Sequence, residues 1–155
     1  MNISSNGPLR ALVYDSAMAK QTSPIASLEL FSGLSKAELK KVEGLMTEIR
    51  LHAGKELMKE GSPGREAMII TSGTACIRRG GRAIATVGPG DILGEMALLA
   101  NQNRTATVTA ESDLIVEVLN RREFMQLLDE VPAIAKKMLI TAISRLNQLE
   151  PSLAG

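Results

Sequence analysis

Apolar residues at helical spacing mark segments on both sides of a long central region. Ser35 and Glu38 form a capping-box pattern, in which a hydroxyl and a carboxylate satisfy backbone N–H groups at a helix start. Asn120 and Glu123 repeat this pattern further along the chain. Together with a proline-bounded third segment, these patterns predict helices over residues 36–46, 120–130 and 132–149.

The third predicted helix carries more apolar surface than one domain needs. Pro132 suits the first position of a helix, and Pro151 lies just past its end. One strip can cover the rest of the domain and the other can pair with a second copy of the chain, although two heptads are too few for a coiled coil. The two strips are Ala135, Leu139, Ala142, Leu146 and Leu149, and Ile134, Met138 and Ile143.

Between the helices, from Thr47 to Val118, short segments rich in Ile, Val, Thr and Met alternate with glycine-containing turns. Turns that recur about every eight residues predict a compact antiparallel sandwich or barrel-like roll. Arg78, Arg79 and Arg82 flank Gly80-Gly81 and indicate a solvated hairpin tip. The predicted strands cover residues 47–51, 56–59, 67–72, 74–79, 83–87, 105–110 and 113–119.

Composition divides the chain into one domain with two short ends. With 155 residues, 45% of them hydrophobic, there is material for a single core. Residues 1–24 mix Ser, Asn, Gly and Pro without clear periodicity and are predicted to be a flexible N-terminal arm. The domain is assigned to residues 25–150, with its roll over about 47–119, and residues 151–155 form a tail.

Charge and rare residue types exclude several functions. Eighteen basic and 17 acidic residues give a net charge of +1, so no overall field attracts nucleic acid or an anionic membrane. One cysteine and one histidine exclude a disulfide scaffold and a His-based metal site, and they supply no nucleophile with a base. No apolar stretch reaches the roughly 18–20 residues of a membrane span. We therefore expect a cytoplasmic protein that is not an enzyme and binds no metal.

One stretch, residues 88–106, breaks the alternation of the roll and carries the candidate chemistry. Gly94 permits close approach to the backbone, and the short helix predicted over 95–99 offers free N–H groups that attract an anion. Arg104 adds paired donors suited to phosphate oxygens. Glu95 would repel a phosphate, so accepting hydrogen bonds from a sugar hydroxyl is its natural role.

The run Gly94-Glu95-Met96-Ala97-Leu98-Leu99, followed by Asn103-Arg104-Thr105-Ala106, resembles the phosphate-binding cassette of cyclic nucleotide-binding domains. The resemblance extends over about residues 30–149. It implies a mainly β fold, an eight-stranded antiparallel jelly-roll with an N-terminal helix and two C-terminal helices. Leu93 stands where phenylalanine is usual, and Asn103 replaces the usual proline before the arginine.

The same resemblance implies residue roles. Glu95 would bind the ribose 2′-hydroxyl, Arg104 the cyclic phosphate, and Thr105 occupies a position that contacts guanine in many cGMP-responsive members. Arg145, on the last helix, would cap the base, or else it is an ordinary solvated arginine. The ligand-binding residues expected are Gly94, Glu95, Met96, Ala97, Leu98, Arg104, Thr105, Ala106 and Arg145.

We therefore predict a cyclic nucleotide-binding sensor that favours cAMP over cGMP. Ligand binding would reposition the C-terminal helices and thereby control an effector protein. Only residues 151–155 follow the last helix, so we expect no DNA binding by this chain alone, and a homodimer could form through that helix. The alternatives are a degenerate roll acting as a ligand-free interaction domain, and a fragment of a larger cAMP-responsive transcription factor, channel, transporter or enzyme.

Overall fold

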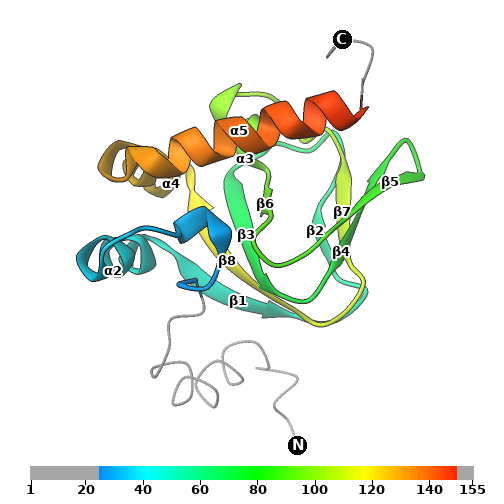
Figure 1. Cartoon of the computed structure of the whole chain (residues 1–155). Coiled ribbons are helices and arrows are strands. Elements are labelled where there is room, and N and C mark those ends of the chain that lie inside the picture. The colour runs from blue at the N-terminus through cyan, green and yellow to red at the C-terminus, as the bar shows by residue number, and fades with distance from the viewer. Residues whose placement is uncertain (1–24, 150–155) are drawn as a thin grey trace, which may run out of the picture.

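The computed structural model describes residues 25–149, and the side chains of residues 25–144. The predicted N-terminal arm and C-terminal tail lie outside the described residues, so both stay predictions. Figure 1 shows a β-roll with one helix, α5, running across it and shorter helices beside it. Among the described residues, no helix is long and apolar enough to cross a membrane.

Eight strands within the described range form two antiparallel four-stranded sheets, with the orders β1-β8-β3-β6 and β2-β7-β4-β5. This arrangement confirms the predicted jelly-roll. β6, which the sequence pattern missed, has only two residues and is therefore too short to show an alternation of apolar and polar positions. The strands are β1 (Thr47–Leu51), β2 (Glu56–Met58), β3 (Glu66–Ser72), β4 (Ala75–Arg79), β5 (Arg82–Val87), β6 (Ile92–Leu93), β7 (Thr107–Ala110) and β8 (Leu114–Asn120).

Both predicted capping boxes are present. The Ser35 hydroxyl accepts from the Glu38 N–H at 3.1 Å, and the Glu38 carboxylate accepts from the Ser35 N–H at 2.9 Å. Asn120 and Glu123 make the equivalent reciprocal pair. A short 3-10 helix, η2, was not predicted because three residues carry no periodic signal. The helical elements are η2 (Glu29–Phe31), α2 (Lys36–Leu45), α3 (Glu95–Leu99), α4 (Arg121–Glu130) and α5 (Pro132–Leu149).

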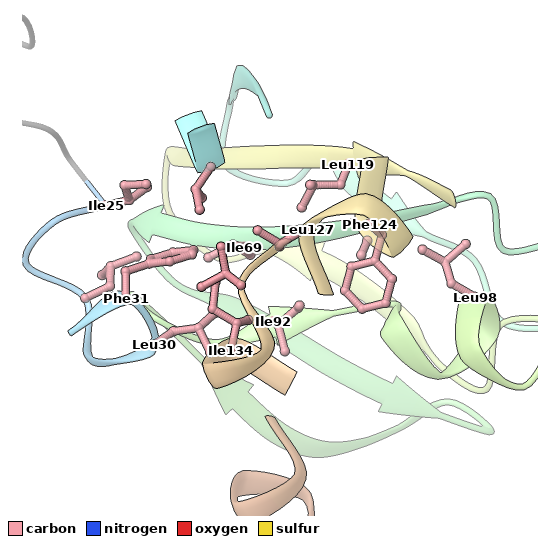
Figure 2. Close-up of a cluster of buried hydrophobic side chains, with 14 residues drawn as sticks. Ile25, Leu30, Phe31, Ile69, Ile92, Leu98, Leu119, Phe124, Leu127 and Ile134 are labelled. Carbon is pink, nitrogen blue, oxygen red and sulfur yellow. The ribbon is translucent and has the colours of Figure 1, made fainter. Parts of the chain in front are cut away.

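The core has two parts, separated by the sheet that contains β3. Ala67 and Ile69 of β3 face the helices and belong to the cluster in Figure 2, where Ile69 lies among side chains from η2, α4 and α5. Met68 and Ile70 point the other way, into the interior of the roll. Because β3 is covered on both faces, its sequence is an apolar run rather than an alternating one.

Among the described side chains of α5, those of the first turns cover the roll. Ile134 is fully buried and Met138 packs against the same cluster, as one predicted strip requires. Ile143, which belongs to that strip by spacing, is half exposed, so the packed strip ends earlier than predicted. Leu139 and Ile140 are also exposed, at 61% and 54%. The middle of α5, from Leu139 to Ile143, therefore presents an apolar surface.

Candidate functional site at the start of α3

The α3 helix begins at a glycine that no other residue can replace without strain. Gly94 follows β6 and has φ 81° and ψ 1°, a left-handed conformation that L-residues with a Cβ disfavour. A Cβ there would overlap the guanidinium of Arg104 and lie 2.8 Å from the carbonyl oxygen of Glu66. The backbone and the surrounding space both require glycine at this turn.

Arg104 is buried beside this turn, with 9% of its surface exposed. Its Nη2 donates to the Glu66 carbonyl oxygen at 2.9 Å, and its Nη1 donates to the Gly94 carbonyl oxygen at 3.3 Å. Burial lowers the pKa of Arg104, and the nearby negative charge of Glu66 opposes that shift. A guanidinium has five N–H donors in a fixed plane, so these two bonds orient it and leave donors for an anion.

The turn that follows β2 fixes the backbone of Arg104, because β2 lies beside β7 in the same sheet. The Arg104 N–H donates to the Ser62 carbonyl at 2.8 Å, and the Gly61 N–H donates to the Arg104 carbonyl at 2.9 Å. This pairing explains why β7 starts at Thr107 rather than at residue 105 as predicted. Arg104 belongs to the turn and not to the strand.

Gly64 brings the same turn into contact with α3. A Cβ at Gly64 would overlap the Cβ of Ala97 and lie 3.3 Å from Nη1 of Arg104. Sequence reasoning did not single out Gly64 or Glu66 as site residues. The adjacent Pro63-Gly64 turn signal was visible, but nothing in the sequence showed which helix it touches.

The Arg104 side chain also borders an open depression of about 310 Å³. Its wall carries both signs of charge, including Lys59 and Arg65 together with Glu56 and Glu66. The guanidinium therefore lies between the α3 start and a polar depression along β2.

The structure brings some of the predicted site residues together and leaves others apart. Gly94, Ala97 and Arg104 meet around the Gly64 turn, and Ala97 and Leu98 are buried on the inner side of α3. Glu95 is half-buried at the first position of α3, and Met96 is 57% exposed. Thr105 is exposed and Ala106 is half-buried in the segment that leads to β7, and the Arg145 side chain lies outside the described ones.

Two further arginines bind the cassette, defined here as residues 94–106, from outside. Arg79 is exposed at the β4–β5 hairpin, as predicted, and its Nε also donates to the Thr105 carbonyl at 3.1 Å. Arg121, at the start of α4, donates to the Leu98 carbonyl at 2.6 Å. Neither contact has a local sequence signal, because the partners are 26 and 23 residues apart. In the described part of the chain, no three His, Cys, Asp or Glu side chains are grouped to hold a metal ion.

Comparison with known proteins assigns the chain to a family. The model of the cyclic nucleotide-binding domain family matches residues 48–131, which include β2 to β8, the cassette and α4. The chain is 35% identical over 120 residues to a cAMP-dependent protein kinase regulatory subunit of Debaryomyces hansenii, covering 76% of this chain and 26% of that protein. It is 34% identical over 107 residues to a cGMP-dependent protein kinase of Toxoplasma gondii, covering 69% of this chain and 10% of that protein.

Solved structures agree with the sequence relatives. The catabolite activator protein of Thermus thermophilus superposes with a TM-score of 0.72 at 28% identity, over 85% of this chain and 62% of that one. The chain thus spans about a quarter or less of the lengths of the two sequence relatives and under two thirds of this structure. The similarity concerns a regulatory domain and not the whole of the larger proteins.

Proposed function

Because this chain belongs to the cyclic nucleotide-binding domain family, we propose that it is a sensor module that binds cAMP, with cGMP as the alternative ligand. The observation that carries the proposal is the buried Arg104 guanidinium, oriented by two backbone carbonyls beside a helix start. A permanent cation with spare, fixed donors suits the phosphate of a nucleotide.

The remaining predicted residues complete the proposed site. N–H groups around Gly94, Met96, Ala97 and Leu98 would bind the phosphate, and those at the first positions of the helix have no partner within it. Glu95 would accept from the ribose 2′-hydroxyl. Thr105 and Ala106 would line the site beyond Arg104, and Arg145 would cap the base.

The choice of cAMP over cGMP rests on weaker support than the choice of a cyclic nucleotide. Of the two sequence relatives above, the one with the higher identity is named for cAMP. Thr105 supports the alternative, because its hydroxyl could bond a guanine. Both ligands carry the same phosphate and ribose, so the proposed roles of Arg104 and Glu95 hold for either.

The proposed mechanism is a population shift. Ligand contacts would order the cassette and reposition the C-terminal helices, which changes the surface that an effector protein reads. The module performs no catalysis itself in this proposal, and we place it in the cytoplasm. A homodimer through α5 would cover the exposed Leu139, Ile140 and Ile143, whereas DNA binding is not proposed for this chain alone.

The test is calorimetric titration of the chain with cAMP, cGMP and 5′-AMP, repeated with Arg104→Ala. We expect one cyclic nucleotide to bind well and 5′-AMP to bind poorly. Arg104→Ala should cost roughly 1.5–3 kcal/mol, or about ten- to a few-hundred-fold in affinity, because charge-assisted hydrogen bonds are lost. Arg122→Ala is the matched control, since it removes an exposed arginine of α4.

Two results would contradict the proposal. A folded chain that shows no binding heat with any nucleotide at several temperatures would instead be a ligand-free interaction domain. Equal affinity of the wild type and Arg104→Ala for the cyclic nucleotide would remove Arg104 from the phosphate site.

A further inference from the structure

Arg121 joins the far end of α3 to the start of α4. Its Nη1 donates to the Leu98 carbonyl at 2.6 Å, and its Nη2 donates to the Asn101 Oδ1 at 3.2 Å. The last carbonyls of a helix lack partners within it, and α3 has only five residues. An external donor therefore contributes a large share of what holds this helix end.

The residues after α3 are shaped to receive this arginine. The Ala100 and Gln102 N–H groups bind the Met96 and Ala97 carbonyls at 2.8 and 3.1 Å, which leaves Leu98 to Arg121. Asn101 has φ 52°, a left-handed conformation that asparagine tolerates better than most residues. The side chain of Asn101 supplies the second acceptor for the Arg121 fork.

Helices α4 and α5 share a hydrophobic cluster with α3. Leu98 is fully buried in the same cluster as Phe124 and Leu127 of α4 and Ile134 of α5, and Figure 2 shows Leu98 beside Phe124. The Val131 N–H binds the Leu127 carbonyl at 2.9 Å across the junction of α4 and α5. The Leu98 side chain therefore packs in the core, and the Leu98 carbonyl accepts a hydrogen bond from Arg121.

We propose that Arg121 is a positioning residue that couples the cassette to the C-terminal helices. Ordering of α3 by a ligand at its start would be passed through Leu98 and Asn101 to Arg121, and so to α4 and α5. The two hydrogen bonds from Arg121 to Leu98 and Asn101 form the Arg121 latch. The existence of the latch is independent of the ligand, whereas its role in transmission rests on the proposed function.

Amide hydrogen exchange, measured with and without saturating cAMP, tests the existence of the latch separately from its role in transmission. Arg121→Ala is compared with wild type, with Arg121→Lys as the conservative variant and with Arg122→Ala as the control. Without ligand, Arg121→Ala should raise exchange at the Ala100 and Gln102 amides by about tenfold, because a charge-assisted hydrogen bond at that helix end is lost. Amides of β3 and β8 should be unchanged.

With cAMP, Arg121→Ala should lose at least half of the ligand-induced change in exchange over α4 and α5, while its affinity falls less than about tenfold. Arg121→Lys should be intermediate, because one ammonium does not reproduce the paired donors. Arg122→Ala should match wild type in both conditions.

Each contrary outcome overturns either the Arg121 latch or its role in transmission. Unchanged exchange at Ala100 and Gln102, or an equal rise that includes β3 and β8, overturns the latch. A full ligand response of α4 and α5 in Arg121→Ala overturns the transmission. No nucleotide binding by the wild type overturns the proposed function and transmission together, while the ligand-free measurement still decides the latch.

Discussion

Among the described side chains, two charged ones are buried, Arg104 and Glu117, and burial affects their protonation differently. Arg104, 9% exposed, keeps its charge and binds two backbone carbonyls beside the α3 start. Glu117 of β8, 7% exposed, has its pKa raised to about 7, mainly by burial and further by Glu48 and Glu43. A guanidinium cannot lose its proton in this range, whereas a carboxyl can take one up.

The neighbours of Glu117 favour its protonated form. Glu48 lies directly opposite it in the β1–β8 register, and Ile69 of β3 lies opposite on the other side. A hydrogen bond with the Glu48 side chain raises the pKa of Glu117 further. A buried charge is a candidate anion-binding group when its chemistry prevents neutralisation and neutral groups orient it, as two backbone carbonyls orient Arg104.

The largest expected effect comes from disrupting the Gly94 turn that contacts the Arg104 guanidinium. Gly94→Ala forces a Cβ into a left-handed turn and against the guanidinium, so affinity for cyclic nucleotide should fall by at least ~100-fold and unfolding free energy by about 2 kcal/mol. Calorimetry and denaturant titration measure both. Gly44→Ala is the control, because it lies in α2 with open space around it and should stabilise the fold by roughly 0.5–1 kcal/mol.

Glu117→Gln should improve stability at high pH. The folded state holds its Glu117 proton up to about pH 7 while the unfolded chain loses it near 4.5, so wild-type stability falls as pH rises between these values. The neutral amide avoids this loss, and we expect it to be about 2 kcal/mol more stable at pH 8 and nearly equal to wild type at pH 4.

Urea unfolding at several pH values tests this, with Glu111→Gln as the exposed control. A variant with the same pH slope as wild type would mean that folding does not shift the pKa of Glu117. The contrast with Arg104 would then fail.

Arg104→Lys sharpens the comparison by keeping the charge and removing the fork. One ammonium cannot bind the Glu66 and Gly94 carbonyls and a phosphate in the same plane, so affinity should fall by roughly 5–30-fold, less than for Arg104→Ala. Titration with the preferred cyclic nucleotide measures it. Wild-type affinity would show that charge alone is sufficient.

Glu95→Gln should have the smallest effect. The substitution would replace the proposed charge-assisted hydrogen bond to the ribose with a neutral one, so cAMP should bind about 3–10-fold more weakly. The loss should shrink for 2′-deoxy-cAMP, which lacks the hydroxyl. Equal losses for the two ligands would contradict the ribose assignment.

The sequence by itself determined the features whose partners lie within a few residues. The two capping boxes join residues three positions apart, and they fixed the starts of α2 and α4. The Gly94 turn and the five-residue α3 were also predictable from the sequence, because a glycine before a run of good helix formers is a local signal. Those residues also carried the family resemblance.

Only the tertiary structure decided which distant groups meet. The Glu66 carbonyl that orients Arg104 is 38 residues away, and the partners of Arg79 and Arg121 are 20 or more residues away. The pairing of Glu48 with Glu117 depends on the strand order β1-β8-β3-β6. Local propensity sets where elements begin and end, whereas sheet order and register set which charges are buried together, and no short-range pattern encodes them.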